Sequence, residues 1–199
     1  MSNSVAPAVA PPTIDARRTA LVRAQILLYV GAASAVATAT IVLFVPTTSD
    51  DGSFHHIGDY VLTAIGIPVV LAPALLLPAL RTLQDKRDGR LGLAGTVAMG
   101  IGAAVLTGMF VYGLIAATGS SLGPTYVLAA AVTIVGVILF AIGSWRAGLL
   151  PRWLLVAWPV AWVVGSLLPI LGPGPLLLAA VYVVMAVLLP RRAATTSAS

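Results

Sequence analysis

The residues best suited to chemistry lie in one polar segment, residues 49–60, which has the sequence SDDGSFHHIGDY. It holds both histidines and three of the six carboxylates of this 199-residue chain: Asp50, Asp51, His55, His56 and Asp59. If the end of the segment is helical, His55 and His56 lie four and three residues before Asp59, on nearly one face. Imidazole and carboxylate together suit a divalent metal such as zinc, or acid/base catalysis in which the carboxylate orients the imidazole.

The same segment has a plainer interpretation. Ser53 or Asp59 could cap the helix that follows, with the negative charge complementing the helix dipole and the histidines solvated. A pH response is a further alternative, because histidine titrates near neutral pH. The spacing permits all of these, so the segment is a candidate site for which we predict no particular metal, cofactor or catalytic residue.

The composition determines where such a site would be. The chain is 59% hydrophobic and 9% charged, with a mean hydropathy of +1.04, which leaves too little polar surface for a soluble domain. Its net charge of +5 comes from short basic clusters between apolar runs. Membrane orientation explains such clusters better than nucleic-acid binding does. The chain has no cysteine, which excludes disulfides and thiolate metal sites.

The apolar runs predict an all-α bundle of six transmembrane helices, at about residues 25–45, 59–80, 91–117, 126–144, 153–171 and 176–189. The last is the shortest, at about 21 Å against a bilayer core of roughly 30 Å. The second contains Pro68, Pro73 and Pro78 and should bend or unwind. We expect a disordered leader (1–20), a membrane domain (21–192) and a disordered tail (193–199).

Basic residues predict the orientation of this bundle. All 11 lysines and arginines lie before the first span, between the second and third, between the fourth and fifth, or after the sixth. The loops on the other side contain none. The positive-inside rule then places both termini in the cytoplasm and residues 49–60 outside.

The predicted membrane interior lacks ionisable side chains. Proton pumps, voltage sensors and most ion-coupled carriers place such groups at membrane depth, so these classes are disfavoured. An uncoupled path for a neutral or apolar molecule stays open, because prolines in broken helices can mark binding sites. Its candidate lining combines those prolines with aromatic residues of other spans: Pro68, Pro73, Tyr112, Trp158, Trp162 and Tyr182. Simple kinks and core packing or lipid contact are the plainer explanation.

Small residues recur at four-residue intervals in the third span, at Gly100, Ala104 and Gly108. This spacing lets another helix backbone approach closely. We expect the stripe to pack within the chain and to make this span the centre of the bundle. A homodimer or a partner protein is the alternative.

Two short segments suggest a family. The segments GSWRAGLLPRW (residues 143–153) and HHIGDY (residues 55–60) resemble those of small multi-helix membrane proteins of high-GC actinobacteria, whose function is uncharacterised. The resemblance implies a bacterial cytoplasmic membrane and assigns no catalytic residue.

Three function classes follow from these patterns. We favour an accessory or structural membrane protein that binds lipid or a membrane partner, because nothing in the predicted interior is placed for chemistry. The alternatives are the uncoupled transport path and a membrane enzyme or sensor that uses residues 49–60. The sequence contains no GxxxxGK[ST], HExxH or GxSxG motif, so catalysis is the less favoured class.

Overall fold

The computed structural model describes residues 13–46, 52–119, 123–167 and 174–196. Five helices in these ranges are long and apolar enough to cross a membrane: α1 (Ile14–Phe44), α2 (Ile57–Leu83), α3 (Gly89–Ala116), α4 (Gly123–Ala147) and α6 (Gly174–Thr196). A shorter apolar helix, α5 (Arg152–Trp162), continues as the π-helix η2 (Val163–Leu167). The prediction of an all-helical bundle is confirmed, and five of its helices have the length and composition of membrane spans.

The short helix is not the one that the sequence predicts. We expected the last span to be shortest, yet α6 has 23 residues and α5 has 11. The apolar run ends at Pro190, but α6 continues through Arg191 and Arg192, whose long side chains can keep their charges in water. Pro159 lies inside α5, where it removes a backbone donor shortly before the helix widens into η2.

The first and last helices extend into the segments that we predicted to be a disordered leader and tail. The hydroxyl of Thr13 accepts a hydrogen bond from the Ala16 amide, at 3.3 Å, and caps α1, which begins at Ile14. Asp15 in the first turn complements the positive end of the helix dipole. Part of the predicted leader and residues 193–196 of the predicted tail are therefore helical.

Three prolines do not interrupt α2. Pro68, Pro73 and Pro78 all lie inside one helix of 27 residues, so, of the two outcomes that we expected, bending or unwinding, unwinding does not occur. Each proline removes one backbone donor but leaves the rest of the hydrogen-bond ladder in place. Pro73 is buried among neighbouring helices, and this packing supports the helix where its own ladder is weakened.

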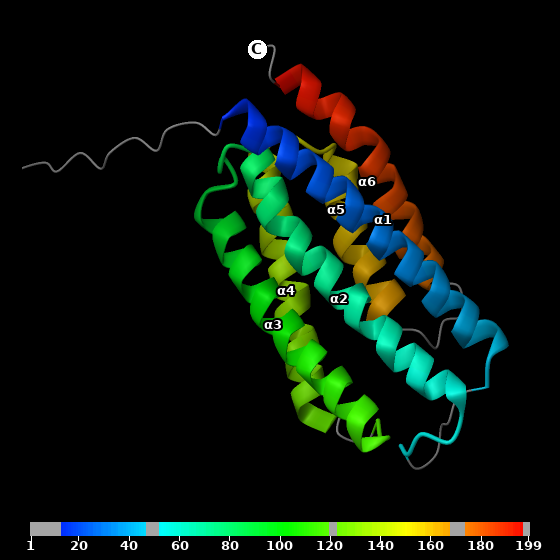
Figure 1. Ribbon diagram of the computed structural model, residues 1–199. Helices are drawn as coiled ribbons and strands as arrows, with labels where there is room; N and C mark the ends of the chain where they lie inside the picture. The colour runs from blue at the N-terminus through cyan, green and yellow to red at the C-terminus, as the bar shows by residue number, and fades with distance from the viewer. Residues whose placement is uncertain (1–12, 47–51, 120–122, 168–173, 197–199) are drawn as a thin grey trace, which may run out of the picture.

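The helices pack as a closed ring in chain order, and α6 returns to lie against α1 (Figure 1). All six contribute buried apolar side chains to one core. Its largest fully buried side chains are Trp158, Trp162, Tyr182 and Phe140. The rings of Phe140 and Trp158 meet edge to face, with centroids 6.2 Å apart. The start of α1 and the end of α6 lie at the same end of the ring (Figure 1).

The prediction that the third span is the central helix is wrong. In α3 the most apolar stretch is 28% buried, against 50% in α4 and α6 (Figure 1 shows α3 at the edge). The expected packing stripe is also wrong as an intramolecular contact. Gly100, Ala104 and Gly108 are exposed, and a Cβ at either glycine would have no atom within 4 Å.

A different set of glycines joins α3 to α4. A Cβ at Gly95 would lie 2.6 Å from the Gly136 carbonyl oxygen, and one at Gly102 would lie 2.9 Å from that of Ala129. A Cβ at Gly143 would lie 2.7 Å from the Gly92 amide nitrogen. Glycine at these positions lets the two backbones approach this closely, so α3 and α4 form a small-residue contact on a different face of α3 from the predicted stripe.

Candidate functional site

The loop before α2 is joined to the end of α3. The Phe54 amide donates to the Ala117 carbonyl at 2.9 Å, and the Gly119 amide donates to the Gly52 carbonyl at 2.6 Å. The Thr118 hydroxyl also donates to the Gly52 carbonyl, at 3.1 Å. These bonds form a short antiparallel link that holds the described part of the candidate segment in one position.

Asp59 serves as the cap of α2. It is 6% exposed, and its Oδ2 accepts hydrogen bonds from the backbone amides of His55, at 3.1 Å, and His56, at 2.9 Å. These amides precede the first turn of the helix and have no acceptor within it. The carboxylate also complements the positive end of the helix dipole. Asp59 is thereby committed to backbone donors of its own loop.

The histidine side chains are arranged differently from the carboxylate. His55 and His56 are exposed, whereas Asp59 is buried. Asp50 and Asp51 lie outside the described residues. Within the described ranges, no group of three histidine, aspartate or glutamate side chains could hold a metal. The geometry therefore supports the capping interpretation, and the metal, acid/base and pH-response interpretations stay predictions.

The predicted pocket lining is only partly brought together. Trp158 and Trp162 of α5 lie beside Tyr182 of α6, and all three side chains are almost fully buried. The Tyr182 ring also lies so close to α1 that a Cβ at Gly31 would be 2.8 Å from it. These three aromatic residues fill space in the core. Pro73 is buried in α2, Pro68 is half-buried, and Tyr112 is 57% exposed on α3, away from the cluster.

A buried polar cluster at the opposite end of the bundle was missed by sequence reasoning. Arg81 Nε lies 2.8 Å from Asp88 Oδ2, and the Asp88 side chain is fully buried. The Gln84 side-chain amide donates to the Ser144 hydroxyl at 3.0 Å, which joins the α2–α3 turn to α4. Two acidic residues inside the otherwise basic segment RTLQDKRDGR were the available signal for this cluster.

The turn that carries this cluster has an unusual backbone. Asp85 and Lys86 adopt positive φ angles of 51° and 59°, and Gly89 one of 63°. The left-handed conformation costs a non-glycine residue roughly 1–2 kcal/mol. The ion pair of Asp85 with Arg17 of α1, at 3.4 Å, helps to hold the turn in place.

Burial raises the pKa of the Asp88 carboxyl above its ordinary value of 3.8, and the Arg81 guanidinium opposes this shift. Oδ1 of Asp88 is buried and has no hydrogen-bond partner in the part of the chain that the structure describes. The carboxylate lies directly over Gly92, where a Cβ would overlap it. These contacts lock the start of α3 against α2 and α4, which is a structural role.

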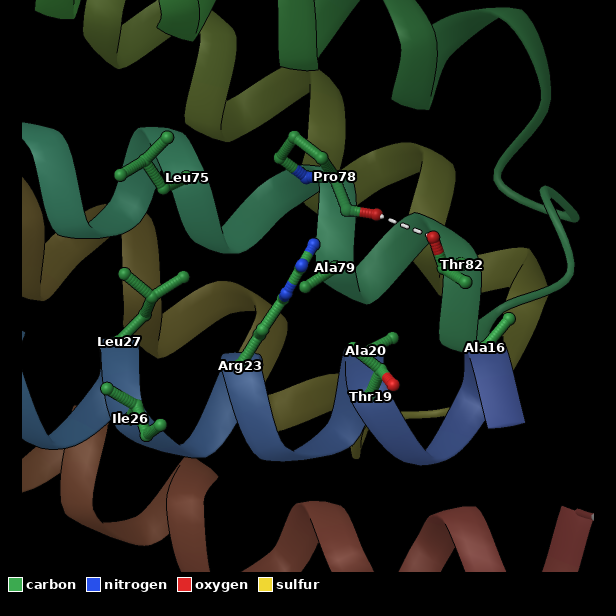
Figure 2. A pocket seen from close by; sticks show the side chains of 10 residues that line it. All are labelled: Ala16, Thr19, Ala20, Arg23, Ile26, Leu27, Leu75, Pro78, Ala79 and Thr82. Atoms are coloured by element: carbon green, nitrogen blue, oxygen red, sulfur yellow. Dashed lines mark hydrogen bonds between the residues drawn. The ribbon is translucent and has the colours of Figure 1, made fainter. Parts of the chain in front are cut away.

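A groove of about 730 Å³ runs between α1 and α2. Its walls come from the first half of α1 and the last half of α2 (Figure 2), with the residues Ala16, Thr19, Ala20, Arg23, Ile26, Leu27, Leu75, Pro78, Ala79 and Thr82. Figure 2 shows Arg23 extending from α1 toward Pro78 and Ala79 of α2. The groove lies on the outside of the ring, because Ile26 and Leu75 at its rim are 56% and 57% exposed.

Comparison of the chain with protein-family models, with curated proteins and with solved structures finds no match.

Proposed function

We propose that this chain is a six-pass integral protein of a bacterial cytoplasmic membrane, with both termini in the cytoplasm, and that it acts as an accessory or structural protein that binds lipid or a membrane partner. Its filled core is the observation that carries this proposal. Aromatic side chains of α4, α5 and α6 occupy the middle of the ring, and all six helices contribute to one apolar core.

The six-pass threading rests on the place of α5. The connection from α4 to α5 lies at the end of the ring where α1 begins, whereas α6 starts at the other end (Figure 1). The chain between Arg152 and Gly174 must therefore travel the length of the bundle. At about 1.5 Å per residue, the 11 residues of α5 alone are too short for this, and η2 extends the crossing.

The orientation rests on the positions of the basic residues. Each cationic cluster lies near a helix end on the same side of this threading: in the first turns of α1, around the α2–α3 turn, around the α4–α5 connection, and near the end of α6. The positive-inside rule then favours the cytoplasm for this end. The resemblance to actinobacterial membrane proteins supports a bacterial membrane.

The filled core favours an accessory role over uncoupled transport, because a carrier needs a path that opens through the bundle. Flux through proteoliposomes tests this. Purified protein is reconstituted, and glycerol and urea uptake is measured by stopped-flow light scattering beside empty liposomes. We expect the rate to equal that of empty liposomes. A faster rate that changes when Trp162 is replaced by alanine would overturn the accessory role and favour transport.

A further inference from the structure

The groove between α1 and α2 changes character along its length. Thr19 and Thr82 place hydroxyl groups near the end where the basic residues gather, and Arg23 follows one turn deeper. Ile26, Leu27 and Leu75 then form an apolar stretch toward the middle of the bundle, and its length from Ala16 to Leu27 is about 16 Å. A polar end that continues into an apolar trough matches the headgroup and the upper acyl chain of a lipid.

The depth of the groove comes from small side chains. Ala20 and Ala79 are 6% and 9% exposed and form the floor where the two helices meet. Larger residues at these positions would fill the space. The rim residues Arg23, Ile26 and Leu75 are exposed, so the groove opens outward. In a membrane, this outward direction faces the lipid.

Among the described residues that line the groove, Arg23 is the only cationic one, and none carries a carboxylate. Neighbouring arginines are already occupied: Arg17 pairs with Asp85, and Arg81 pairs with Asp88. Arg23 has no ion pair within the described part of the chain. A guanidinium at this depth gains most from a phosphate, which it can bind through two parallel hydrogen bonds.

We propose that this groove binds one anionic glycerophospholipid of the leaflet at the basic end, with its phosphate on Arg23, its headgroup near Thr19 and Thr82, and an acyl chain against Ile26, Leu27 and Leu75. Basic pockets between membrane helices on the cytoplasmic side are suited to such lipids. A soluble anion would leave the apolar half of the groove unused, and a zwitterionic headgroup would bring an ammonium group close to Arg23. The inference rests on the proposed function, which does not name a lipid, and it specifies the class of lipid and the place where it binds.

Native mass spectrometry of the full chain in detergent micelles tests the site. Wild type, Arg23→Gln and Arg18→Gln are titrated separately with phosphatidylglycerol, phosphatidylcholine and inorganic phosphate. Arg18 is the matched control, because it is an exposed arginine on the same helix outside the groove. Thr19→Phe keeps the charge of Arg23 but fills the polar end of the groove from an exposed position. Circular dichroism melting shows that each variant is folded.

We expect wild type and Arg18→Gln to bind one phosphatidylglycerol in preference to phosphatidylcholine. Arg23→Gln should weaken this binding roughly tenfold to hundredfold, which is what the loss of a charge-assisted hydrogen bond produces. Thr19→Phe should weaken it by a similar factor. Equal phosphatidylglycerol binding by Arg23→Gln and Arg18→Gln would overturn the site, and so would equal binding by Thr19→Phe and wild type. Displacement of phosphatidylglycerol by inorganic phosphate at the same concentration would also overturn it. None of these results alters the flux measurement, so the proposed accessory role is tested independently of this lipid site.

Discussion

A matched pair of alanine substitutions in α3 tests how this helix is rotated in the bundle. Gly95 faces α4, where a Cβ would lie 2.6 Å from the Gly136 carbonyl oxygen and 2.9 Å from the Phe140 Cα. Gly100 lies on the exposed face of the same helix, where a Cβ would have no atom within 4 Å. Both obstacles at Gly95 belong to the backbone of α4 and cannot rotate away, so the two helices must separate to admit a methyl group.

The expected magnitudes follow from this contrast. Both substitutions gain the same helix propensity, up to about 1 kcal/mol. Gly95→Ala also incurs the cost of overpacking, which is about 1–3 kcal/mol. Because the propensity gain is common to both, the variants should differ by about 1–3 kcal/mol in the free energy of unfolding. Gly100→Ala should be as stable as wild type or slightly more stable.

The assay is unfolding of each purified variant in mixed micelles of a mild detergent and sodium dodecyl sulfate, followed by far-ultraviolet circular dichroism. A lower midpoint for Gly95→Ala than for Gly100→Ala is the expected result. Equal midpoints would refute the close contact between α3 and α4. A lower midpoint for Gly100→Ala would show that the stripe of Gly100, Ala104 and Gly108 is the true packing surface.

Three further predictions concern the polar contacts. Asp59→Ala should lower the free energy of unfolding by about 1 kcal/mol, because it removes a helix cap, and the loss should be the same with and without a metal chelator. If a chelator lowers the stability of the wild type, a metal is bound in residues 49–60 instead. For Asp88, whose folded pKa is raised, the folded state binds the proton more readily than the unfolded chain. Stability should therefore increase as the pH falls from above that raised pKa toward 3.8, and Asp88→Asn should remove this slope, whereas an unchanged slope would assign it to another group. Ser144→Ala should cost about 1–2 kcal/mol in the same unfolding assay, because it leaves the buried Gln84 amide without its partner, and unchanged stability would contradict that contact.

The helical class of the fold could be predicted because it depends on composition and on long apolar runs. Helix lengths and the rotation of each helix about its axis could not be predicted, since they depend on contacts with neighbouring helices. The apolar run of α6 stops at Pro190, but the helix continues to Thr196. Two sets of small residues lie on α3, and the sequence alone does not show whether the set with Gly95 or the set with Gly100 meets α4. Only the position of α4 distinguishes them.

The candidate sites were predicted with similar limits. The spacing of His55, His56 and Asp59 placed one carboxylate correctly at the start of α2, and capping was one of the alternatives that we derived. The buried pair of Arg81 and Asp88 was missed, because a charged loop is ordinarily solvated and burial cannot be read from it. The groove around Arg23 was missed for another reason, since its two walls lie far apart in the chain, with 48 positions from Leu27 to Leu75.

The threading of the chain is most directly tested by labelling single thiols. The chain has no cysteine, and His56 and Arg87 are both exposed, on opposite sides of the proposed membrane. Intact cells that express His56→Cys or Arg87→Cys are treated with a membrane-impermeant maleimide. The six-pass orientation predicts that the His56→Cys variant is labelled in intact cells, and that the Arg87→Cys variant is labelled only after the membrane is permeabilised. The reverse pattern, or labelling of both variants in intact cells, would contradict it.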